Sequence, residues 1–183
     1  GIRSLLSLFD QESQGKRTVQ LSLPKGTKLE TFSGSSSLGD VTLSNLSAKN
    51  ADFSLSNGSL TVNDSQFASG KFKNSLGEIT FNNSQINSGK INASSGTITL
   101  SNSQFASGEI ANSLGEVNLN SSKISDSTLK ISSGSLNSEQ LELAGTISIT
   151  DQLGDINLHL VSGSLSQLSF DLKTDLGEID IPS

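Results

Sequence analysis

Residues 71–89 read KFKNSLGEITFNNSQINSG, and this stretch carries the pattern that decides the fold. Apolar and polar side chains alternate along it, which is typical of a β-strand with one buried face. Gly77 interrupts the alternation as a bend or a bulge does, and the Asn- and Ser-rich segments 82–84 and 87–89 indicate turns. The side chains that we expect to point inward are Phe72, Asn74, Leu76, Ile79, Phe81 and Ile86.

The same pattern returns at a constant 19-residue step. The repeated glycines are Gly39, Gly58, Gly77, Gly96, Gly115 and Gly134, with Gly154 one residue late. A second column with the same step contains Phe67, Ile86, Phe105 and Ile124. A short constant period means that one supersecondary unit is stacked many times, so we expect an all-β, right-handed parallel β-helix or β-solenoid. A thin solenoid also explains why only 32% of the 183 residues are hydrophobic.

A finer alternation leaves two coil lengths open. Leu precedes the glycine, and Asp or Glu follows it, at Gly39, Gly77, Gly115, Gly154 and Gly177. In the intervening units Asn or Ser precedes the glycine, and Ser or Thr follows it. A 19-residue coil would alternate large and small side chains along each column, whereas a 38-residue coil would make a wide, flat solenoid. In the wide form the acidic residues would stack about 4.8 Å apart and repel one another, so we favour the 19-residue coil.

The two ends of the chain depart from the repeat. Residues 1–30 are expected to form an N-terminal cap, in which the apolar run 2–9 suits either a short helix or a first strand. Residues 31–183 are expected to form the solenoid, as part of a single domain. Its C-terminal end is predicted to be narrowed, because Gly163 and Gly177 follow Gly154 after only nine and then fourteen residues.

Composition excludes several classes of function. The net charge of −6 argues against nucleic acid and anionic lipid as partners. The chain has no cysteine for a disulfide, a thiolate metal site or a thiol nucleophile, and no apolar stretch long enough to span a membrane. Because the first residue is Gly1 and not Met, we expect that a signal or an anchor preceded it.

The repeated element, Ser, Asn or Leu before the glycine and an alternating apolar pair after it, resembles an adhesin-type domain family of unknown function from bacterial envelope proteins. The segment Val19 to Leu29, followed by Ser-rich sequence and by Leu38 to Leu43, is similar to the usual start of that family, and the resemblance covers residues 18–181. It implies a right-handed parallel β-helix-like domain of a longer membrane-anchored or secreted protein of Gram-positive type. The implied location is the cell envelope or the outside of the cell. The family has no defined catalytic residues to transfer.

Catalytic and metal-binding motifs are missing from the sequence. His159 is the single histidine, and we expect it at the surface, with neither a triad nor a zinc site around it. We predict no cofactor, no bound metal and no catalytic residue. The best candidate for an interaction face is a column of acids, each of which follows a Leu-type glycine: Asp40, Glu78, Glu116, Asp155 and Glu178. In 19-residue coils these acids would recur every second layer, about 9.6 Å apart.

The sequence is therefore compatible with two candidate functions. The first is a non-enzymatic β-solenoid module of the cell envelope, an adhesin-type interaction or spacer domain with a protein or an envelope glycan as its partner. The alternative is a carbohydrate-active β-helix enzyme or a polysaccharide-binding module. The enzyme is disfavoured because arginine occurs only at positions 3 and 17, outside the coils, and because all eight aromatic residues are Phe, mostly at inward positions. An ice-binding solenoid would need an array of threonines, and the pair Thr97 and Thr99 is not repeated.

Overall fold

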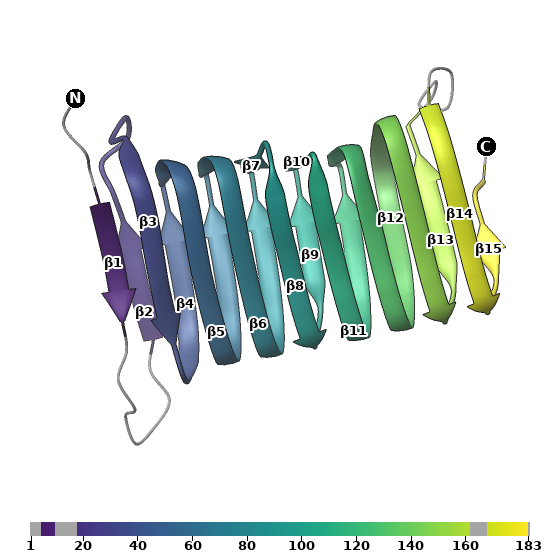
Figure 1. Ribbon diagram of the computed structural model, residues 1–183, viewed down its shortest axis with the longest axis horizontal. Coiled ribbons are helices and arrows are strands. Elements are labelled where there is room, and N and C mark those ends of the chain that lie inside the picture. The colour runs from purple at the N-terminus through teal and green to yellow at the C-terminus, as the bar shows by residue number, and fades with distance from the viewer. Residues whose placement is uncertain (1–4, 10–17, 162–167, 183) are drawn as a thin grey trace.

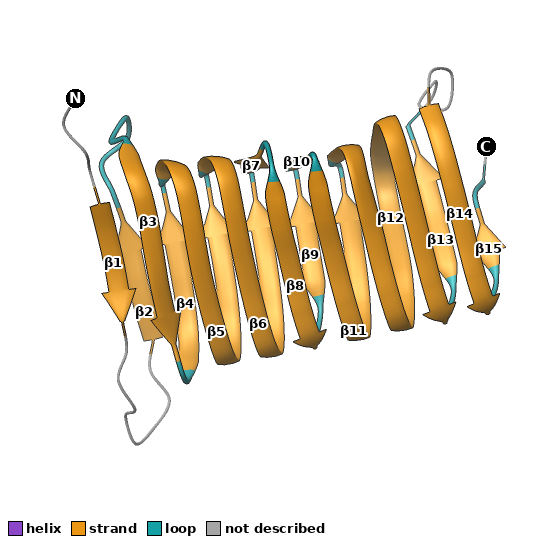
Figure 2. Cartoon of the chain, in the orientation of Figure 1, coloured by secondary structure: helices purple, strands orange, loops and turns teal. Residues whose placement is uncertain are grey.

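The computed structural model describes residues 5–9, 18–161 and 168–182, and within these ranges the chain contains strands and no helix (Figures 1 and 2). No described segment therefore offers an apolar helix of the length that a bilayer crossing needs. The strands are β1 (Leu5–Phe9), β2 (Thr18–Ser22), β3 (Leu29–Ser36), β4 (Gly39–Ser44), β5 (Ser47–Asn63), β6 (Gln66–Asn82), β7 (Gln85–Ile86), β8 (Gly89–Ser95), β9 (Ile98–Ser101), β10 (Gln104–Ala106), β11 (Gly108–Asn120), β12 (Lys123–Leu153), β13 (Ile156–Leu160), β14 (Leu168–Leu176) and β15 (Ile179–Asp180).

The strands stack into a parallel β-solenoid with about 19 residues per coil. Val62 of β5 lies beside Phe81 of β6, and Phe81 lies beside Leu100 of β9, in parallel register at each step. The 19-residue coil is thus confirmed and the 38-residue coil is excluded. The stack is elongated, and its two ends carry the N- and C-terminal strands (Figure 1).

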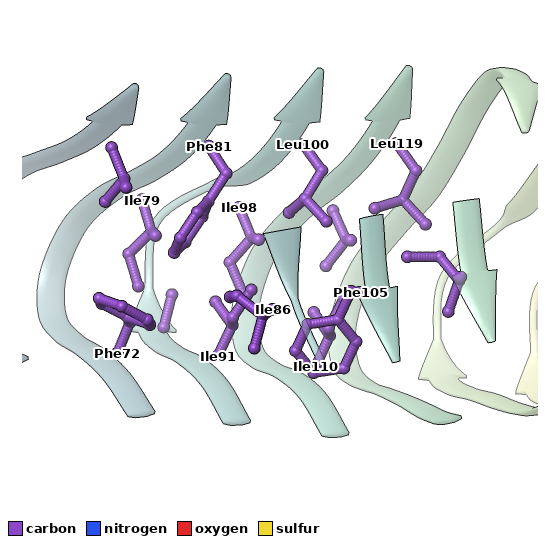
Figure 3. Packing of buried hydrophobic residues seen from close by; sticks show 14 of the residues in the cluster. Phe72, Ile79, Phe81, Ile86, Ile91, Ile98, Leu100, Phe105, Ile110 and Leu119 are labelled. Carbon is purple, nitrogen blue, oxygen red and sulfur yellow. The ribbon is translucent and has the colours of Figure 1, made fainter. Parts of the chain in front are cut away.

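The core consists of columns of side chains that run along the stack. Ile79, Ile98 and Val117 are fully buried one above the other, and Phe81, Leu100 and Leu119 form a second column beside them (Figure 3). The rings of Phe72 and Phe81 meet edge to face with centroids 5.0 Å apart, which fills the centre of their coil. Of the six side chains expected to point inward, Phe72, Asn74, Ile79, Phe81 and Ile86 are buried, which confirms the prediction for them, and Leu76 is exposed.

Gly77 shows why glycine recurs at the corner between the two sheet faces. Its φ is 126°, and a Cβ there would lie 1.8 Å from the carbonyl oxygen of Gly58 in the preceding coil. Only a residue without a side chain lets the backbones of successive coils approach this closely. The glycines therefore form a column of their own, and each corner holds the two residues that flank its glycine in a constant position.

The ends of the stack differ from the sequence interpretation in detail. β1 and β2, within the segment expected to form a cap, extend the solenoid by pairing in parallel with β3 and β4, so residues 5–9 form a strand and not a helix. At the other end, Ile179 pairs with Ile156, and a Cβ on Gly177 would contact the carbonyl of Gly154. The step from Gly154 to Gly177 is therefore longer than the 19- and 20-residue steps between the preceding corner glycines, and the prediction of a compressed end is wrong. Gly163 lies outside the described residues.

Candidate interaction edge

One corner of the solenoid carries both a leucine column and the acidic column. We call it the leucine–acid edge, which consists of Leu38, Leu76, Leu114, Leu153 and Leu176 together with Asp40, Glu78, Glu116, Asp155 and Glu178. Each leucine directly precedes a corner glycine and each acid directly follows it, so the glycine column positions both side chains. The residues that alternate with the leucines are small and polar: Leu76 pairs with Asn57 on one side and with Ser95 on the other.

The leucines of this edge point away from the core. Leu76, Leu114, Leu153 and Leu176 are 51–70% exposed, and Leu38 is half-buried. The prediction that Leu76 points inward is therefore wrong. Alternation holds up to the buried Asn74, but the corner inserts an extra residue between Asn74 and Ile79, so the side chains at positions 76 and 78 both face solvent.

The acids line the same corner as the sequence predicts. Glu78, Glu116, Asp155 and Glu178 are exposed, whereas Asp40 is half-buried and accepts a 2.8 Å hydrogen bond from the Ser59 hydroxyl. Small residues separate the acids, since Ser59 lies between Asp40 and Glu78 in register. The alternation ends at the C-terminal end, where Leu153 pairs directly with Leu176 and the Asp155 carboxylate accepts a 2.9 Å bond from the Glu178 backbone N–H.

Four lysines of the described part of the chain form ion pairs with acids that do not belong to this edge. Lys49 contacts Glu30, Lys90 contacts Glu109, Lys123 contacts Glu142 and Lys173 contacts Asp175, at nitrogen–oxygen distances of 3.3–4.0 Å. Glu78 and Glu116 have no ion pair and no side-chain hydrogen bond with the residues that the structure describes. At Glu78 and Glu116 the leucine–acid edge thus carries negative charge that no described residue compensates.

A buried polar column lies directly behind this edge. The Asn74 side-chain amide donates to the carbonyls of Gly58 and Glu78 at 2.9 and 3.0 Å, and Asn112 makes the equivalent bonds to Gly96 and Glu116. Asp151 occupies the same column, is fully buried, and neither of its carboxyl oxygens has a partner. Burial raises the pKa of Asp151 to about 6. The sequence interpretation gave no role to Asp151, although its position in a column with two asparagines was visible.

His159 is exposed, as expected of a surface residue. Its Nδ1 lies 3.0 Å from a carboxylate oxygen of Glu139 and 3.1 Å from the backbone carbonyl of Ser138. Within the described ranges no three His, Asp or Glu side chains converge on a point where they could hold a metal ion. A shallow groove at the N-terminal end is lined by Lys28, Lys49, Gln66 and Gln85, with Phe67 beneath it, and none of the leucine–acid residues borders that groove.

Comparison with known proteins places the chain in a family without giving it a biochemical activity. No curated protein and no solved structure matches it. A family model described as Toastrack DUF4097, a domain of unknown function, matches residues 3–183. Because the match spans nearly the whole sequence and the fold is a parallel β-solenoid, the chain belongs to the Toastrack family.

Proposed function

We propose that this chain is a non-enzymatic interaction and spacer module of a bacterial cell-envelope protein. The observation that carries the proposal is the leucine–acid edge, in which exposed leucines and acids repeat along one corner of the stack. Exposed apolar side chains gathered in one place are typical of protein interaction sites. The envelope location and the adhesin-type role follow from the sequence resemblance, and the partner is a protein or an envelope glycan.

The spacer role follows from how the coils are joined. Every pairing between strands is parallel, and successive coils share backbone hydrogen bonds from corner to corner, for example Gln66 N–H to the Leu46 carbonyl at 2.8 Å. Each added coil lengthens such a stack by about 4.8 Å. A continuous hydrogen-bonded stack resists bending, so it would hold the partner at a set distance from whatever the chain is attached to.

The enzyme alternative has little support from the acids. A general acid in a glycosidase is usually sheltered in an apolar pocket, which keeps it protonated at neutral pH. Glu78, Glu116 and Asp155 are instead exposed. We therefore propose that the chain performs no catalysis, and incubation with envelope polysaccharides should yield no cleavage products. Turnover that disappears in the Glu78→Gln, Glu116→Gln double variant would overturn this proposal.

The location can be tested separately because the chain contains no cysteine. Lys73 is exposed on β6, away from the core, so Lys73→Cys introduces a single reactive thiol without disturbing the packing. In intact cells of the organism that encodes the chain, a membrane-impermeant maleimide should label this variant. Labelling only after lysis would rule out the envelope. The control is Ile98→Cys, whose buried thiol should react only after denaturation.

A further inference from the structure

In the part of the chain whose side chains the structure describes, the exposed large apolar side chains gather at one place. Among the described residues, the large hydrophobic side chains that are exposed are four leucines of the leucine–acid edge and Ile179, which lies next to that edge at the C-terminal end. Most of the other large apolar side chains of the described residues are buried or pack against the core. A solenoid that buries its leucines elsewhere, yet exposes them at one repeated position, presents them for contact.

The leucines are separated from one another by notches. Leu76 and Leu114 lie two coils apart, about 9.6 Å, with Ser95 between them in register with both. Ser133 follows Leu114 in the same way. Leu76 and Leu114 therefore each protrude between two short side chains, and each layer that carries a leucine also carries an acid just beyond the glycine.

This spacing fits the surface repeat of an α-helix. Residues seven positions apart on a helix lie on one face and are separated by about 10.5 Å, within about 1 Å of the distance between successive leucines. A β-strand repeats the same face every 6.6–6.8 Å, which fits the spacing less well. A helix with an apolar stripe would place its own side chains into the notches over Ser95 and Ser133.

The negative charge of the edge favours a partner whose contacting surface is positively charged. Glu78 and Glu116 are exposed and make no ion pair with the described residues, whereas Lys90 and Lys123 are already engaged by Glu109 and Glu142. A helix whose apolar stripe is flanked by Lys or Arg would supply the missing cations. A second copy of this chain brings no cation in the leucine–glycine–acid motif, and an anionic lipid surface would be repelled by the acids.

We propose that the leucine–acid edge docks a basic amphipathic α-helix of a partner protein, with leucines at the centre of the contact and acids at its rim. This proposal rests on the interaction role proposed above. The helix lies along the stack, so that its heptads follow the leucine-bearing layers from Leu76 through Leu114 to Leu153, beyond which Leu176 follows after a single layer. Apolar contact supplies most of the affinity, and the acids govern the rate of association and its dependence on salt.

The probe is a synthetic three-heptad helical peptide with one Leu-rich face flanked by lysines, and its binding to the full chain is followed by fluorescence anisotropy. Leu76→Ser with Leu114→Ser should weaken binding at least ~10-fold, since the centre of the contact is lost. Glu78→Gln with Glu116→Gln should weaken it most at low salt. The matched control, Glu109→Gln with Glu142→Gln, changes the net charge equally on other columns and should leave affinity within about twofold.

The serine variants are expected to fold, because Ser95 and Ser133 already occupy the same column in neighbouring layers, and circular dichroism with thermal melting checks this. Equal binding of a scrambled peptide of the same composition would overturn the proposal. So would peptide binding that is insensitive to the leucines, or self-association by sedimentation that the leucine variants abolish. Failure of the peptide to bind overturns the helix partner alone, because the envelope location is measured independently by cysteine labelling.

Discussion

Asp151 occupies a column position at which the other coils need a hydrogen-bond donor, and an ionised carboxylate has none. In its column, Asn74 and Asn112 each donate two hydrogen bonds to backbone carbonyls, whereas a carboxylate at Asp151 has no proton to donate. Desolvation is the main cause that raises its pKa to about 6, and the charge of Asp155 adds to the rise. The nearby backbone amide of Leu153, which forms no hydrogen bond of good geometry with the carboxylate, offsets part of it. The protonated form is the one that suits this site.

We therefore predict that Asp151 makes the fold more stable in mild acid than at neutral pH. Because the pKa of Asp151 is raised in the folded state, its protonation contributes fully to the free energy of unfolding below about pH 4. This contribution is lost as the pH rises through about 6. The shift from 3.8 to about 6 corresponds to about 3 kcal/mol of unfolding free energy. Asp151→Asn, which copies Asn74 and Asn112, should stabilise the fold at pH 7.5 and remove this part of the pH dependence.

Urea denaturation of both proteins between pH 4 and pH 8 measures that difference. The exposed Asp155→Asn serves as the control, because its side chain faces solvent and its removal should leave most of the pH dependence in place. Parallel stability curves for the native chain and Asp151→Asn would show that Asp151 is ionised and satisfied at every pH.

Phe81 is one of the largest fully buried side chains of the core. It is 1% exposed and meets the ring of Phe72 edge to face. Phe81→Ala should lower the free energy of unfolding by about 3–5 kcal/mol, because the neighbouring columns cannot close the cavity that it leaves. Thr80→Ala, on the outward side of the same strand, should cost far less. Comparable losses for the two variants in chemical denaturation would contradict the assigned register.

At the scale of the element, a ladder of buried serines joins the turns. Ser84 donates its hydroxyl to the Asn82 carbonyl at 2.9 Å and accepts the backbone N–H of Ser65 at 3.1 Å. Ser65, Ser103 and Ser122 make equivalent bonds, each donating to a carbonyl two residues back and accepting a backbone N–H from the preceding coil. The residue just before each serine has a positive φ, as at Asn83, and this tight bend leaves backbone groups that the hydroxyls satisfy.

Ser84→Ala should therefore destabilise the fold by about 1–3 kcal/mol, since it leaves the buried N–H of Ser65 without its acceptor. Ser88→Ala is the matched substitution, because the Ser88 hydroxyl is exposed and makes only a 3.4 Å contact with the Ser107 carbonyl. It should change stability by less than about 0.5 kcal/mol. Thermal unfolding of both variants measures this difference. Equal midpoints would mean that water replaces the Ser84 hydroxyl as the acceptor of the Ser65 N–H.

The corner is the element that sequence reasoning predicted least well. The strands on both sides of Gly77 follow simple alternation, so the inward positions of Phe72, Ile79 and Phe81 could be predicted from period two alone. The exposure of Leu76 could not be predicted, because its hydrophobicity suggests burial and the sequence pattern does not show where the backbone inserts its extra residue. The sequence pattern indicated Gly77 as the point at which the inward–outward alternation breaks, but the alternation already ends between Asn74 and Leu76. Charge and position both favoured exposure of the acids, which is correct for Glu78, Glu116 and Asp155 but not for the half-buried Asp40.

At the scale of the whole molecule, a constant 19-residue step was sufficient to predict parallel stacking, because only identical coils keep identical columns in register. Departures from the step were harder to interpret. Gly163 and Gly177 suggested two short coils, yet Gly177 stacks on Gly154, so the extra length belongs to a single coil. Spacing alone therefore did not show which of the later glycines stacks on Gly154.

Because each coil contacts only its neighbours, removing whole coils should shorten the stack without unfolding it. Deletion of residues 71–108 removes two whole coils and joins Gly70 to Glu109, which preserves both the 19-residue register and the alternation of Leu-type and Ser-type corners. The shortened chain should melt cooperatively and should be about 9.6 Å shorter in small-angle X-ray scattering. Deletion of residues 71–79 alone should prevent folding, since it misaligns every later column. A folded product from the short deletion, or an unfolded one from the long deletion, would show that the coils are not the interchangeable units on which the spacer role depends.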